Sequence, residues 1–65
     1  MVTRLELLLE RRTSFINELI ELNIYVENEA LTEDQRELIK NHIIEVETIL
    51  DDIDNKIQHL KAESK

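Results

Sequence analysis

The chain of 65 residues contains no glycine, no proline and no cysteine. Without cysteine, it has neither disulfides nor cysteine-ligated zinc sites, which are two common means of stabilising a very small domain. Without glycine, it has neither the two-residue hairpin turns typical of β-sheets nor the glycine-rich loops that bind nucleotide phosphates. Oligomerisation is the remaining means of stabilising so short a chain, which we expect to form one domain over residues 1–65.

The sequence also lacks long apolar runs and an excess of positive charge. No run approaches the ~18 apolar residues of a membrane-spanning helix, and the first residues do not form the uncharged apolar core of a signal peptide. The net charge of −7 argues against general nucleic-acid binding and against attachment to anionic membranes. We therefore expect an acidic, cytoplasmic protein without a membrane partner.

A regular apolar pattern is the clearest positive feature of the sequence. Its spacings alternate between four and three residues, as in a helix that packs along another helix. The residues of this pattern are Ile39, Ile43, Val46, Leu50, Ile53, Ile57 and Leu60. A second pattern of the same kind consists of Leu5, Leu8, Arg12, Phe15, Leu19, Leu22 and Val26. The two patterns predict an all-α protein.

Two capping signals place the starts of the helices. Thr3 is followed three residues later by Glu6, and Thr32 is followed three residues later by Gln35. In such a capping box, the threonine oxygen and the longer side chain satisfy free N–H groups at a helix start. The predicted helices are about residues 3–28 and 33–61.

The short link between the helices predicts an antiparallel hairpin. Because no glycine is available, we expect Asn28 to close the first helix in the left-handed conformation. The alternative is a single continuous helix. It is disfavoured because steps of seven from Val26 reach only charged residues, namely Glu33, Lys40 and Glu47.

The chain has more apolar residues than a two-helix hairpin can bury. The surplus consists of Leu7, Ile20, Ile24, Tyr25, Leu38, Ile44 and Ile49. We therefore expect self-association, most simply as two hairpins in a four-helix bundle. The expected core and oligomer interface comprises Leu8, Phe15, Leu19, Leu22, Ile39, Ile43, Val46, Leu50, Ile53, Ile57 and Leu60. Two alternatives remain open: another protein covers the surplus, or these are ordinary surface residues.

The charged residues suggest a register ion pair and a partner surface. Arg12 is the one charged residue within an apolar pattern, and antiparallel pairing brings it near Asp51. We expect these two residues to form an ion pair that sets the register of the helices. A possible partner surface comprises Arg4, Arg11, Ile20, Ile24 and Tyr25.

The sequence offers little for catalysis or for metal binding. Neither Ser14 nor Ser64, the only serines, stands in a recognisable arrangement with a histidine and an acid. Neither His42 nor His59 belongs to the Glu-x-x-His motif of di-metal helical bundles. We therefore expect a protein that is not an enzyme and that has no cofactor and no metal.

The pattern favours a small interaction module that associates with itself and acts by binding another protein. In size, hairpin architecture and acidity, the chain resembles the Rop family of plasmid RNA-binding regulators. That resemblance implies an RNA-binding hairpin dimer that would use Arg4, Arg11 and Arg12 beside Phe15. A purely structural oligomerisation element is the third hypothesis.

Overall fold

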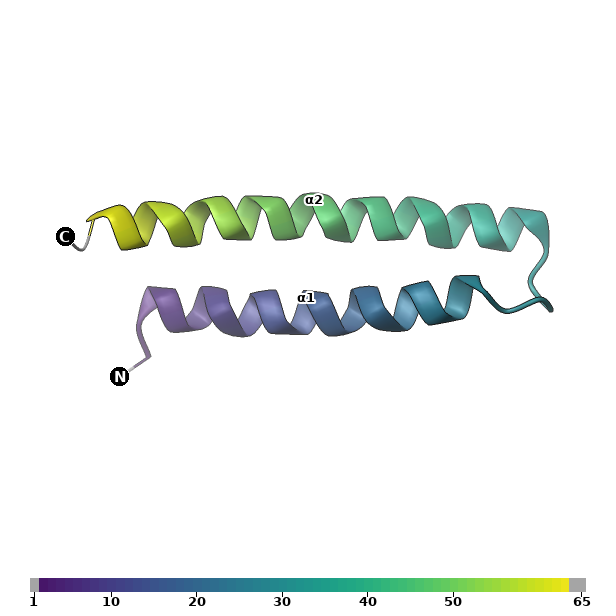
Figure 1. Ribbon diagram of the computed structural model, residues 1–65, viewed down its shortest axis with the longest axis horizontal. Coiled ribbons are helices and arrows are strands. Elements are labelled where there is room, and N and C mark those ends of the chain that lie inside the picture. Colours follow the sequence, from purple (N-terminus) through teal and green to yellow (C-terminus); the bar gives the residue numbers. More distant parts are fainter. Residues whose placement is uncertain (1, 64–65) are drawn as a thin grey trace.

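The computed structural model describes residues 2–63. Its two α-helices, α1 (Arg4–Val26) and α2 (Glu33–Glu63), run antiparallel and side by side (Figure 1). The predicted all-α hairpin is therefore confirmed. Helix α1 ends two residues before its own predicted end, and α2 continues two residues beyond the end predicted for it. The molecule measures 50 × 19 × 12 Å, so along its shortest dimension it is a single helix thick.

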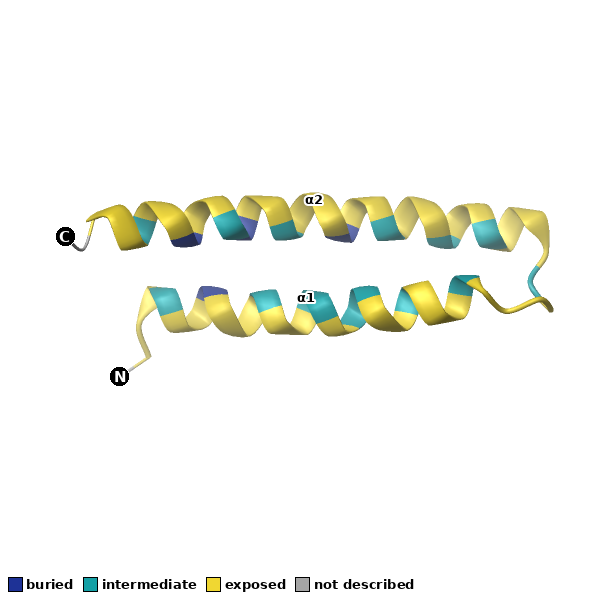
Figure 2. Cartoon of the chain, in the orientation of Figure 1, coloured by how far each residue is buried: buried dark blue, intermediate teal, exposed yellow. Residues whose placement is uncertain are grey.

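The buried part of the molecule is small. Among residues 2–63, four hydrophobic side chains are buried: Leu8, Val46, Ile53 and Ile57. They face the seam between α1 and α2 (Figure 2). Leu8, Ile53 and Ile57 form a cluster with the half-buried Leu5, Phe15 and Leu60 packed against it. This cluster lies toward the end of the hairpin that carries both chain termini.

Both capping signals act in the structure. The Glu6 N–H donates to Thr3 Oγ1 at 3.1 Å, at the start of α1. At the start of α2 the box is reciprocal: the Gln35 N–H donates to Thr32 Oγ1 at 3.2 Å, and the Thr32 N–H donates to Gln35 Oε1 at 3.0 Å. These bonds satisfy N–H groups that a helix start leaves free, and they fix where each helix begins.

The link between the helices differs from the prediction at Asn28. No non-glycine residue between positions 2 and 63 has a positive φ, so Asn28 is not left-handed. Helix α1 instead ends at Val26, and the capping residue that follows it, Glu27, lies in the right-handed region with φ −81° and ψ −5°. The Asn28 side chain accepts a hydrogen bond from the Ala30 N–H at 3.0 Å. Asparagine therefore turns the chain through its side-chain oxygen, which makes a left-handed backbone unnecessary.

Arg36 holds the link against the end of α1. Its Nε donates to the carbonyl oxygen of Val26 at 3.3 Å, and its Nη2 donates to that of Asn28 at 3.4 Å. The last carbonyls of a helix have no partners within the helix and carry partial negative charge. The Arg36 guanidinium therefore satisfies the last carbonyl of α1, at Val26, and its second bond, to Asn28, ties α2 to the link.

Candidate protein-interaction surface

The eleven residues expected at the core and oligomer interface all lie at least half-buried between the two helices. The hairpin alone buries Leu8, Val46, Ile53 and Ile57 among them, and the remaining seven are partly accessible. The surplus residues lie outside this seam. Those that belong to α1 lie on two different flanks of the hairpin, and the two flanks differ in chemistry.

The first flank is marked by an ion pair. Arg12 Nε donates to Asp54 Oδ1 at 2.7 Å, and both side chains are nearly half exposed. The predicted ion pair between Arg12 and Asp51 is therefore wrong, because the partner of Arg12 is Asp54. A helix turns by about 100° per residue. Asp54 follows the buried Ile53 by one residue and lies beside the seam, whereas Asp51 precedes Ile53 by two residues and points to solvent.

An apolar stripe runs along α1 on this first flank. Leu9 borders a shallow hollow together with Arg12 and Asp54, which places it on their side of the hairpin. Steps of seven, four and four residues from Leu9 continue the same face of the helix. We call this set the apolar stripe: Leu9, Ile16, Ile20 and Ile24. Leu9, Ile20 and Ile24 are 42%, 54% and 68% exposed, and Ile16 is half-buried, so three of the four side chains are open to solvent.

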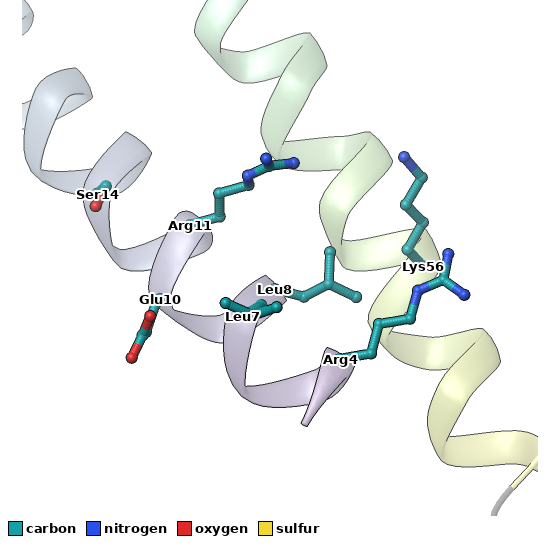
Figure 3. Close-up of a pocket in the computed structure, with 7 residues that line it drawn as sticks. All are labelled: Arg4, Leu7, Leu8, Glu10, Arg11, Ser14 and Lys56. Atoms are coloured by element: carbon teal, nitrogen blue, oxygen red, sulfur yellow. The ribbon is translucent and has the colours of Figure 1, made fainter. Parts of the chain in front are cut away.

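The opposite flank carries a cationic hollow at the terminal end of the hairpin. The hollow has a volume of about 480 Å³ and is lined by Arg4, Leu7, Leu8, Glu10, Arg11, Ser14 and Lys56. The side chains of Arg4 and Arg11 extend toward α2, Leu8 points into the gap between the helices, and Glu10 points away (Figure 3). We call Arg4, Arg11 and Lys56 the cationic rim of this hollow.

The residues predicted to form one partner surface therefore divide between the two flanks. Arg4 and Arg11 lie on the cationic flank, while Ile20 and Ile24 belong to the apolar stripe. Tyr25 lies eighteen residues from Leu7, which is five helical turns, and so shares the cationic flank. All five residues lie outside the seam, and helical periodicity separates them by flank.

His42, on the cationic flank, links the helices; from the sequence it was considered only as a metal ligand, and its contact with α1 was not predicted. His42 Nε2 lies 2.9 Å from Glu18 Oε1 on α1, and His42 Nδ1 lies 3.6 Å from Glu45 Oε2. The hydrogen bond to Glu18 raises the pKa of His42 above its ordinary value of 6.5, partial desolvation opposes the rise, and Glu45 adds to it. Protonation of both ring nitrogens therefore strengthens a contact between α1 and α2.

We expect this contact to make the stability of the hairpin depend on pH. A raised pKa in the folded state means that the stabilisation is complete below the ordinary pKa of 6.5 and is lost as pH rises through the higher folded value. Thermal unfolding followed by circular dichroism should show that the native chain is more stable than a His42→Gln variant at about pH 5.5, with the difference fading toward about pH 8.5.

The control for this experiment is a Glu18→Gln variant, which removes the principal acceptor of the histidine. This variant should lose the same extra stability at low pH. Adding His42→Gln to it should change the thermal stability little further. A native chain that keeps its advantage over His42→Gln unchanged across this range would contradict the proposed contribution of the imidazolium.

Residues 2–63 contain no candidate for a membrane span or for a metal centre of three or more ligands. In that part of the chain, no helix is long and apolar enough to cross a membrane. The same residues contain no group of three or more histidine, cysteine, aspartate or glutamate side chains suited to holding a metal ion.

Comparison with protein-family models finds no match, and neither curated protein sequences nor solved structures yield a similar chain.

Proposed function

We propose that the chain is a non-enzymatic protein-interaction module that associates with itself through the apolar stripe, two hairpins forming a four-helix bundle. The observation that carries this proposal is the balance of buried and exposed apolar side chains. Among residues 2–63, four large hydrophobic residues are buried, and nine are 40% exposed or more. The nine are Val2, Leu7, Leu9, Ile20, Ile24, Tyr25, Leu38, Ile44 and Ile49.

The accessible surface of the hairpin supports the same proposal. It measures 5430 Å², whereas a compact monomer of 7.7 kDa exposes about 4,300 Å². The excess of about 1,100 Å² exceeds the roughly 800 Å² that each partner buries in a standard protein interface. A second copy that covers one flank would bring the exposed area per chain close to that of an ordinary globular protein.

The apolar stripe is the better of the two flanks for this contact. Its four members are all aliphatic, and α2 contributes the half-buried Ile43 and Leu50 at the edge of the seam. The Arg12–Asp54 ion pair borders the stripe near the terminal end. An apolar centre with a charged border is the usual composition of a stable interface.

Self-association by this flank leaves the cationic flank on the outside of the bundle. In the proposed mechanism, the paired hairpins present a rigid helical surface to another protein. The function then consists of binding, without a chemical step, and the partner is selected by the shape and charge of the exposed flank.

Sedimentation velocity measured over a range of chain concentrations tests the proposal. We expect a particle of twice 7.7 kDa or a higher multiple at micromolar concentration, dissociating on dilution. A helical chain that remains a 7.7 kDa monomer throughout would overturn self-association and leave the apolar stripe for a different protein.

A further inference from the structure

The cationic rim is unusual because, among residues 2–63, two of its members pair with no carboxylate even though the chain is strongly acidic. The sequence holds fifteen aspartates and glutamates against eight lysines and arginines. Arg12, Arg36 and Lys56 each pair with a carboxylate. Within residues 2–63, neither Arg4 nor Arg11 forms an ion pair or a side-chain hydrogen bond. Arg4 and Arg11 therefore carry the uncompensated positive charge at this hollow, so a carboxylate placed beside either of them would be stabilised.

The spacing of the two arginines defines what would fit between them. Arg4 and Arg11 are seven residues apart on α1, a separation of about 10.5 Å along the helix axis. Leu7 and Leu8 lie between them and give the hollow an apolar floor, with Leu7 55% exposed. Lys56 contributes a third cation from α2. The hollow thus combines an apolar centre with positive charge at both ends.

We propose that this hollow binds an acidic amphipathic helix of a partner protein. An aliphatic side chain of that helix would rest on Leu7 and Leu8, and two carboxylates about two turns apart would pair with Arg4 and Arg11. Guanidinium groups suit this role because they form paired hydrogen bonds with a carboxylate. This inference rests on the proposed function as a protein-interaction module and specifies the partner's chemistry.

The observations favour a protein helix over RNA. A phosphate backbone would gain nothing from the leucine floor. The lining of the hollow also contains no aromatic side chain on which a base could stack. Glu10 borders the hollow and Asp52 already pairs with Lys56, so the local positive charge is limited. The net charge of −7 repels any anionic ligand, and it repels a polyanion such as RNA more strongly than a helix that carries two carboxylates at this site.

Fluorescence anisotropy with labelled synthetic helices tests the inference. The probe is an alanine-rich helical peptide with one leucine midway between two glutamates that are two turns apart. A second peptide carries lysines in place of the glutamates. We expect the native chain to bind the glutamate probe and not the lysine probe. An Arg4→Gln, Arg11→Gln double variant should weaken binding by about tenfold or more, because both counter-ions of the probe are lost.

The control for charge is Lys40→Gln, which removes one positive charge, half of what the double variant removes, at an exposed position near the loop end of the hairpin. It should leave the affinity for the glutamate probe unchanged, whereas a comparable loss would mean general charge attraction and would overturn the site. Two other results would overturn the inference: no binding of the glutamate probe by the native chain, or tighter binding of a short RNA hairpin that the double variant abolishes.

Sedimentation of the same variants separates this inference from the proposed function. If the double variant associates with itself as the native chain does and loses the probe, the cationic hollow is a distinct binding site. If the double variant instead becomes monomeric, a second copy occupies the hollow. That outcome would support self-association while overturning the inference of a partner helix.

Discussion

Replacing Ile53 with alanine is expected to remove about 2–5 kcal/mol from the free energy of unfolding, the range observed when a buried isoleucine or leucine is truncated. Ile53 is 4% exposed and belongs to the cluster with Leu8 and Ile57. With only four buried hydrophobic residues in the described chain, neighbouring side chains have little means of refilling the cavity. A domain of this size has so little stability to lose that the variant would be largely unfolded at ordinary temperature.

Urea unfolding followed by circular dichroism measures this loss, and Ile44→Ala provides the matched control. Ile44 lies on the same helix and is 61% exposed, so the same truncation should change the stability by no more than about 0.5 kcal/mol. Equal losses at the two positions would show that the seam between the helices is not the source of stability.

Replacing Ile20 with glutamate is expected to abolish self-association and leave a 7.7 kDa species in sedimentation velocity. Ile20 lies in the middle of the apolar stripe and is 54% exposed, so the hairpin itself accommodates a charged residue there. In the proposed bundle, the same carboxylate would be buried without a partner, which costs several kcal/mol. The dissociation constant should therefore rise on the order of 100-fold or more.

Leu38→Glu is the matched control for this substitution. Leu38 is 70% exposed, the substitution adds the same charge, and the residue lies on α2 outside the proposed interface. The control should retain the native association state. If Leu38→Glu dissociates the assembly and Ile20→Glu does not, the copies associate through a surface other than the apolar stripe.

The fold was largely predictable because its signals are local. The alternation of four and three residues locates the seam, and the box formed by Thr32 and Gln35 fixes the start of α2. The conformation of Asn28 was not predictable in the same way. A link without glycine can close through a left-handed residue or through a side-chain hydrogen bond, and only the packing of both helices selects between these two solutions.

The pairing of charges was less predictable than the positions of the helices. Counting residues from the link brings a group of carboxylates near Arg12, but the choice of Asp54 depends on the rotation of α2 about its axis. The contact between Glu18 and His42 depends on the same rotation. Long charged side chains reach several positions on a facing helix, so sequence spacing alone does not single out the partner.

The cluster of Leu8, Ile53 and Ile57 has a consequence for the kinetics of folding, because it lies far along the chain from the link. The entropy lost on closing a loop grows with its length, so contacts beside the link form at lower cost than one joining residues 8 and 53. Contacts that form after the folding transition state chiefly control the rate of unfolding. We therefore expect the contacts at the open end to control the lifetime of the native hairpin more than the speed of its formation.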